Sequence, residues 1–218
     1  MNRGHMNRMP NLPSPPGYET AYAQSYQLAF DRLAESDPVI LCQRTGASLT
    51  PDSKLELAFL NTQVIVEIKQ RTLDAPGHPL SITDKLPILH YLVTASGRPK
   101  TGKSISFKDL PEGAGYFPTF YKRAIGPVVH KFGNAHGDLA AAALKLGGNP
   151  IDLGDVGVSI PVFPKISIDW ILWRGDGVLP PEGSILFDSS VTGYLPVEDI
   201  AVLCHSIANR LCENKAEL

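Results

Sequence analysis

The chain has 218 residues, of which 43% are hydrophobic, so it is long enough to bury a core, and its formal net charge is −2. A balance so close to neutral gives no basic field, so we expect no nucleic-acid partner. No apolar run reaches the length of a membrane span, and the N-terminal residues lack the apolar core of a signal peptide. We therefore expect a cytoplasmic protein with no membrane partner.

The composition also indicates the fold class. Nineteen prolines and nineteen glycines against 19% charged residues indicate many turns and short elements, as in an α+β protein. Residues 1–16 hold four prolines and predict a disordered arm or a remnant of cloning. For residues 17–218 we expect a single α+β domain with a mainly antiparallel sheet, made from two hairpins and packed against four or five helices.

The N-terminal part of that domain is predicted to be helical. Apolar side chains recur at helical spacing between Tyr18 and Glu35, at Tyr22, Tyr26, Ala29 and Leu33. The tripeptide Ser36-Asp37-Pro38 ends this helix and starts a short second one, which Gly46 terminates.

Two hairpins are predicted from partial or continuous apolar strand patterns. Leu55–Leu60 and Val64–Ile68 flank a turn at residues 61–63 and fit an antiparallel pair. Val156–Phe163 and Ile166–Trp173 form the second pair, joined around Pro164-Lys165. Ile185–Phe187 starts a further buried strand.

The remaining elements are mostly helices. Thr83 or Asp84 is expected to cap a helix that runs to about Ser96 and stops at Gly97. A short strand follows at residues 105–107. Residues 116–132 look helical although Pro118, Gly126 and Pro127 must bend or divide the helix, and residues 138–146 and the C-terminal segment around 200–211 complete the set.

One segment satisfies the phosphate-loop pattern G-x-x-x-x-G-K-S through Gly97, Gly102, Lys103 and Ser104. In a working phosphate loop a strand precedes the glycines and a helix follows, so that backbone amides and the helix dipole point at one anion. Here a predicted helix precedes the segment, and a short β-branched run broken by Pro111 follows it. We therefore predict a helix-to-strand connection, and a nucleotide-dependent enzyme stays an alternative.

A longer series of motifs is distributed over about residues 18–212. In order they are Leu89-His90-Tyr91-Leu92, Ser96-Gly97-Arg98-Pro99-x-Thr101-Gly102, Ser106-Phe107-Lys108-Asp109-Leu110-Pro111, Lys131-Phe132-Gly133, Leu146-Gly147-Gly148, Gly154-Asp155, Trp173-x-Gly175-Asp176, Pro180-Pro181, Leu186-Phe187-Asp188 and Tyr194-Leu195-Pro196-x-Glu198-Asp199. The series resembles a prokaryotic family of unknown function found mainly in anaerobic bacteria and archaea, sometimes fused to a domain that binds an iron–sulfur cluster.

The resemblance implies a setting and no established activity. In the family the position of Lys103 is not held to lysine, which argues against a phosphate loop. Where the family resembles Gly-Asp-Glu-Glu-Phe-Pro-Pro, residues 175–181 here lack two carboxylates and an aromatic side chain. The four-cysteine motif of the fused domain is also absent, so we expect a cluster, if any, on a protein partner.

Several acidic residues are weighed as site candidates. Asp176 and Asp188 are candidates for a carboxylate pair that binds a metal or transfers protons in a hydrolase. The competing interpretation, which we favour, is that each shapes a turn. Glu198 and Asp199 fall in the first turn of the last helix, where negative charge complements the helix dipole. His90 has apolar neighbours and is interpreted as a core histidine.

The leading hypothesis is a non-enzymatic small-molecule or cofactor-binding accessory protein of anaerobic metabolism, with cofactor unknown. A tetrapyrrole such as corrinoid or haem is conceivable, from the family's setting and from an aromatic region that contains a histidine. The ligand-binding candidates are Tyr116, Phe120, Tyr121, His130, Trp173, Asp176 and Asp188. A third hypothesis is a protein-interaction module that uses the C-terminal helix or the Pro180-Pro181 loop.

Overall fold

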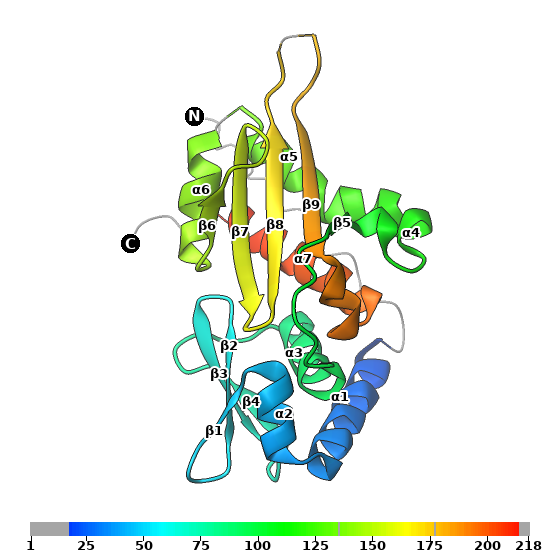
Figure 1. The fold of residues 1–218 in the computed structure, drawn as a ribbon, viewed down its shortest axis with the longest axis vertical. Helices are drawn as coiled ribbons and strands as arrows, with labels where there is room; N and C mark the ends of the chain where they lie inside the picture. Colours follow the sequence, from blue (N-terminus) through cyan, green and yellow to red (C-terminus); the bar gives the residue numbers. More distant parts are fainter. Residues whose placement is uncertain (1–17, 135, 177, 214–218) are drawn as a thin grey trace, which may run out of the picture.

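The computed structural model describes residues 18–134, 136–176 and 178–213, so the predicted arm at residues 1–16 lies outside the described residues (Figure 1). The helices are α1 (Tyr18–Glu35), α2 (Pro38–Thr45), α3 (Ile82–Thr94), α4 (Gly113–Phe120), α5 (Gly126–Phe132), α6 (His136–Lys145) and α7 (Val197–Cys212). The strands are β1 (Ser48–Leu49), β2 (Leu55–Phe59), β3 (Thr62–Glu67), β4 (Thr72–Asp74), β5 (Ser104–Ser106), β6 (Asn149–Ile151), β7 (Val156–Phe163), β8 (Ile166–Trp173) and β9 (Glu182–Asp188).

The predicted α+β class with antiparallel pairing is confirmed, but the two hairpins lie in two sheets and not in one. The first sheet has the order β1-β2-β3-β4 and the second the order β5-β9-β8-β7-β6. A backbone hydrogen bond from Leu60 N–H to the Val162 carbonyl, 3.0 Å long, links the two. Alternation of apolar residues shows which face of a strand is buried, but it does not show which other strand lies beside it. The sequence pattern therefore could not show that the two hairpins lie in different sheets.

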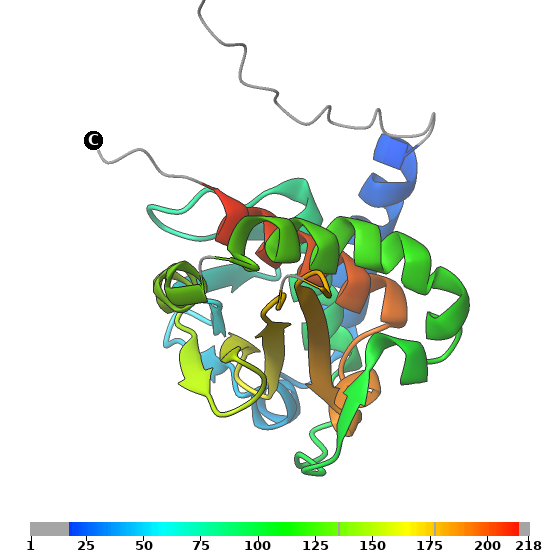
Figure 2. The ribbon, with the colours of Figure 1, turned by 90° about the horizontal axis from the view of Figure 1, so that it is seen from above.

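The second sheet carries one buried face. Across β7, β8 and β9 the opposed pairs Val158–Trp170 and Ile168–Phe187 are buried. Seen from above, α5 and α7 lie along this side of the strands (Figure 2). The apolar stripe of α7, including Leu203 and Ile207, is buried, which leaves little of this helix for the partner contact proposed from the sequence.

The predicted helix at residues 116–132 is divided, as its prolines and glycine indicated, and the helices outnumber the four or five expected. A π-helical segment, Tyr121–Ile125, separates α4 from α5. Pro127 has no N–H group to donate back to residue 123, and the Gly126 N–H bonds to the Tyr121 carbonyl, five residues earlier. The π-helical turn therefore carries the chain past a proline without ending the helical path.

The N-terminus of α3 differs from the prediction. Ser81, and not Thr83 or Asp84, is the N-cap of α3. Asp84 is the third helical residue, and its side chain accepts a bond from the Ser81 N–H to complete a capping box. Asp84 is fully buried, and its carboxylate contacts α7 as well as Ser81.

Two charged contacts join α3 to α7. The Asp84 carboxylate accepts bonds from Ser206 Oγ at 2.7 Å and from Arg210 Nη2 at 2.6 Å. Nearer the other end of α3, His90 Nδ1 lies 2.6 Å from Asp199 Oδ2. Because the start of α3 meets the end of α7, the helices are antiparallel, and the two contacts fix their register.

We predict that Asp84→Ala lowers the free energy of unfolding by about 3 kcal/mol, because it leaves Arg210 and Ser206 without their buried partner. Urea denaturation of the single variants and of Asp84→Ala/Arg210→Met measures the coupling between the two side chains. A loss below about 1 kcal/mol in Asp84→Ala would show that the contact contributes little to stability.

Candidate functional site

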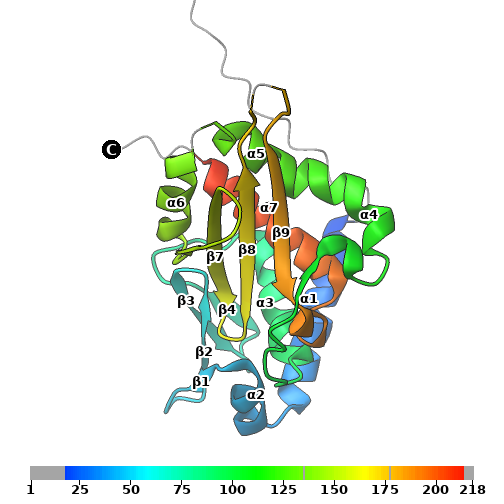
Figure 3. The same cartoon turned by 45° about the horizontal axis from the view of Figure 1, so that its top comes forward.

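The segment between Ser96 and Lys103 connects a helix to a strand, as predicted. It leaves α3 after Thr94 and enters β5 at Ser104. The strand and helix that a phosphate loop requires are therefore in the wrong order, and the nucleotide-binding alternative loses its structural basis. In Figure 3 this segment runs past the end of β9 on its way to β5. We call residues 96–103 the connecting loop.

The carboxylate of Asp188, the last residue of β9, holds the end of the connecting loop. The backbone N–H of Thr101 donates to Oδ1 at 3.0 Å and that of Gly102 to Oδ2 at 2.7 Å. Thr101 Oγ1 adds a bond of 3.1 Å, and the Ser190 N–H adds one of 2.9 Å. The loop N–H groups that would bind phosphate in a phosphate loop therefore donate to a carboxylate of the protein itself.

This arrangement shifts the acidity of Asp188. Partial burial by itself raises the pKa of Asp188, but the hydrogen bonds from Ser190, Thr101 and Gly102 outweigh it, so the pKa lies well below its ordinary value. The carboxylate is consequently charged at neutral pH and acts as a fixed acceptor.

Further contacts hold the loop along its length. Ser96 N–H donates to the Gly193 carbonyl at 2.8 Å, and the Tyr194 hydroxyl donates to the Arg98 carbonyl. Gly97 and Gly102 have positive φ values of 72° and 74°, where a side chain would be strained. The side chains of residues 96–103 are exposed, yet the backbone that carries them is bonded to the core.

A cavity of about 440 Å³ opens beside the end of this loop. Its lining consists of Lys103, Ser104, Ile105, Asp109, Leu110, Pro111, Ser189 and Thr192. The Ser189 N–H donates to the Lys103 carbonyl at 2.8 Å, so the turn after Asp188 forms one wall and is tied to the loop. We call this space the Lys103 cavity.

Asp109 lies on the cavity lining that follows β5. Its Oδ2 accepts bonds from Ser106 N–H at 2.8 Å and from Ser106 Oγ at 2.7 Å. Those bonds, the side-chain bond first, lower the pKa of Asp109, and the charges of Lys103 and Lys108 add to the effect. In the described residues no ion pair within 4.0 Å joins Lys103 to Asp109, so neither charge is cancelled by direct contact.

Asp176 and Asp188, the proposed carboxylate pair, lie at opposite ends of β9. Asp176 accepts bonds from Val178 N–H at 2.9 Å and Leu179 N–H at 2.7 Å, which confirms that it shapes a turn. Asp188 lies six residues along β9 from Glu182, the start of that strand, which is roughly 20 Å. The two carboxylates are too far apart to share a metal or a proton, so the hydrolase hypothesis built on them is wrong.

The aromatic and histidine candidates do not lie together in one site either. Phe120 is buried and stacks on Phe107 with ring centroids 3.9 Å apart, whereas Tyr116 on α4 and Tyr121 on the π-helical segment are exposed. His130 is exposed nine residues beyond Tyr121, or roughly 13 Å along the helical path. Trp173, which is 41% exposed, lies at the end of β8. Neither the Lys103 cavity nor the core gap described next is lined by these side chains.

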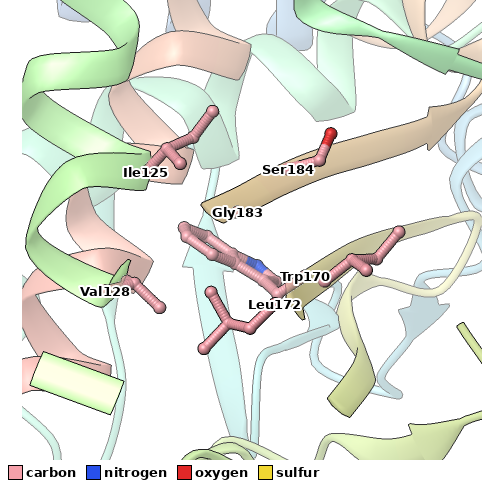
Figure 4. A pocket seen from close by; sticks show the side chains of 7 residues that line it. Ile125, Val128, Trp170, Leu172, Gly183 and Ser184 are labelled. Atoms are coloured by element: carbon pink, nitrogen blue, oxygen red, sulfur yellow. The ribbon is translucent and has the colours of Figure 1, made fainter. Parts of the chain in front are cut away.

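A gap in the core lies between α5 and the second sheet (Figure 4). Trp170 fills its centre, with Ile125, Val128 and Leu172 around the indole ring. Trp170 Nε1 is buried without a hydrogen-bond partner in the described residues. The gap has no room for a water molecule, so it is a packing defect and not a ligand site.

The comparison with family models decides the classification. A model of a domain of unknown function, DUF3786, matches residues 37–210. The chain belongs to the DUF3786 family. No curated protein matches this DUF3786 chain, and no solved structure matches it.

The DUF3786 match spans every residue of the Lys103 cavity. Sequence reasoning named Lys103 and Ser104 but missed Asp109, Ser189 and Thr192. The pattern Ser106-x-x-Asp109, a capping-box signature, and the serines after Asp188 were the available signals.

Other candidate chemistry in this DUF3786 chain is limited. Burial raises the pKa of the Cys42, Cys204 and Cys212 thiols, so none is an activated thiolate. Among the described residues no group of three or more His, Cys, Asp or Glu side chains is placed to hold a metal ion. In that same part of the chain, no helix has both the length and the apolar character needed to cross a membrane.

We predict that Asp188→Asn lowers the free energy of unfolding at neutral pH by about 2 kcal/mol, because hydrogen bonds to a charged acceptor become bonds to a neutral one. Folding lowers the pKa of this carboxyl, so its contribution is fully present above the unfolded pKa of about 3.9 and is lost as pH falls through the folded pKa. The difference between the two proteins should therefore shrink below about pH 4.

Urea denaturation across the acid range measures this difference. Asp152→Asn, at an exposed aspartate in the loop after β6, is the matched control and should show a smaller change. A difference between wild type and Asp188→Asn that stays constant with pH would contradict the role given to the charge.

Proposed function

We propose that this DUF3786 protein is a non-enzymatic binding protein for a small polar anion, which it holds in the Lys103 cavity. The observation that carries the proposal is a cavity of about 440 Å³, within the size range of small-molecule sites, with an ammonium group and three hydroxyl side chains in its lining. The backbone on both sides of Lys103 is fixed by Asp188 and Ser189, so the site is largely formed before a ligand arrives.

The charge distribution supports a compact anion. Lys103 has no carboxylate within 4.0 Å in the described part of the chain, so its charge is available to a ligand. The hydroxyl groups of Ser104 and Thr192 supply directional donors beside it, whereas the Ser189 hydroxyl donates to Thr101 Oγ1 at 2.7 Å and can only accept from a ligand. Asp109 on the same lining repels additional negative charge, which favours a small carboxylate or a single phosphate over a polyphosphate.

A binding role is preferred to a catalytic one because the cavity lacks an obvious proton-transfer or nucleophilic pair. Its lining has no histidine or cysteine, and the only carboxylate in it, Asp109, has a lowered pKa and is a poor base at neutral pH. The His90–Asp199 contact belongs to the interface of α3 and α7 and not to this lining.

An accessory role in anaerobic metabolism, beside a partner that carries an iron–sulfur cluster, is a further proposal that rests on the family resemblance alone. A tetrapyrrole ligand is not part of the proposal, since Phe120 is buried against Phe107 and His130 lies apart from the exposed tyrosines.

The test is thermal unfolding of the full chain with phosphate, sulfate or citrate as the probe. A ligand at about one hundred times its Kd should raise the Tm by roughly 5 °C, because it binds the folded state alone. Lys103→Ala should keep the basal Tm and lose this shift, since its side chain is exposed and not paired.

Lys122→Ala is the matched control, because Lys122 is exposed on the π-helical segment away from the cavity. The control should keep the full shift. No shift in the wild type with any of the three anions, or the same shift in Lys103→Ala, would refute anion binding at this site.

A further inference from the structure

Four cationic side chains lie on three neighbouring segments, beside the Lys103 cavity but outside its lining. They are Arg44 on α2, Arg98 and Lys100 on the connecting loop, and Lys165 in the turn between β7 and β8. All four are exposed. We call this set the cationic face; it lies toward the lower part of the view in Figure 1, where α2, the end of α3 and the β7–β8 turn approach one another.

Backbone contacts place these three segments side by side. A Cβ on Gly97 would lie 3.2 Å from Arg44 Cα, so the connecting loop rests on the end of α2. A Cβ on Gly46 would lie 2.8 Å from Pro164 Cβ and 3.6 Å from Lys165 Cε, which brings the β7–β8 turn to the same helix end. Lys100 Nζ lies 3.4 Å from Ser167 Oγ on β8.

Buried aromatic side chains hold α2, the connecting loop and the β7–β8 turn together. The Tyr91 hydroxyl donates to the Thr45 carbonyl at the end of α2, at 2.7 Å. The Tyr91 ring stacks on Phe163, just before the β7–β8 turn, with centroids 4.2 Å apart. The Tyr194 ring lies nearly parallel to that of Tyr91, with centroids 6.0 Å apart, and its hydroxyl donates to the Arg98 carbonyl. One aromatic stack therefore supports all three segments.

The four charges of the cationic face are not neutralised within the described chain. None of the ion pairs among the described residues includes Arg44, Arg98, Lys100 or Lys165. Asp188, the carboxylate that contacts the same loop, accepts bonds from backbone N–H groups and keeps its negative charge. In a protein whose net charge is −2, four cations against this one carboxylate are still a local excess of positive charge.

The face also has an apolar component. Ile40 is 45% exposed and lies four residues before Arg44 on α2, so the two side chains share one side of that helix. Arginine is enriched at protein interfaces, and an apolar side chain beside it adds area that a partner can bury.

We infer that the cationic face is a docking surface for an acidic segment of a partner protein, one that presents carboxylates to Arg44, Arg98, Lys100 and Lys165 and an apolar side chain to Ile40. A single small anion reaches too few of these groups, because they come from three separate segments. A nucleic acid fits less well, since the protein's net charge is negative and the exposed aromatics, Tyr116, Tyr121 and Trp173, lie on α4, the π-helical segment and β8 rather than on this face.

Fluorescence anisotropy with the full chain tests the inference, with a labelled peptide of alternating glutamate and leucine as the probe. An all-glutamate peptide and a labelled single-stranded oligonucleotide are the competing probes. We expect the mixed peptide to bind more tightly than either, with an affinity that falls as salt is added. Arg98→Glu/Lys100→Glu should weaken its binding at least tenfold, and Ile40→Ser should weaken it less.

Lys122→Glu/Lys145→Glu is the matched control, because it changes the net charge by the same amount at exposed positions on the π-helical segment and α6. Circular dichroism of each variant checks that it folds. The inference is overturned if the control loses as much binding as Arg98→Glu/Lys100→Glu, if the oligonucleotide binds more tightly than the mixed peptide, if Ile40→Ser has no effect, or if no peptide binds at low salt.

Discussion

The bond between the Asp188 carboxylate and the backbone of the connecting loop is the contact on which the Lys103 cavity depends. It joins the end of β9 to a loop that lies 86 and 87 residues earlier in the sequence. Charge-assisted hydrogen bonds to N–H groups are stronger than neutral ones, so one side chain fixes two consecutive loop residues. Lys103 follows directly, and its position at the cavity is therefore set by a carboxylate that is not part of the lining.

The same loop serves two surfaces of different character. Its end borders the Lys103 cavity, which is polar and of small-molecule size, while its middle contributes Arg98 and Lys100 to the cationic face. Tyr194 and Asp188 hold the two parts separately. Because a fixed backbone reduces the entropy lost on binding, both surfaces are preorganised although their side chains extend into solvent. A ligand in the cavity and a partner on the face would bind next to each other.

Local patterns predicted much of the fold. The two hairpins were predicted from apolar runs and turn residues. The helix-to-strand connection at residues 97–104 was predicted from the helix cap signals and from Pro111. The turn at Asp176 was also predicted. The sequence did not reveal that Asp188 bonds to Thr101 or that His90 meets Asp199, 109 residues away, because spacing carries no information on which distant segments pack together. Spacing also did not show that the aromatic candidates are separated, because Phe120 lies in the core and its neighbour Tyr121 at the surface.

Amide hydrogen exchange at Thr101 and Gly102, followed by NMR in the unmodified protein at neutral pH, tests the central contact most directly. Both residues are exposed, so free loop amides at these positions would exchange as fast as those of an unstructured peptide. We predict that both exchange at least a hundredfold more slowly, because each N–H is bonded to Asp188. Exchange at the unprotected rate would contradict the account, since the backbone beside Lys103 would then not be fixed at the cavity.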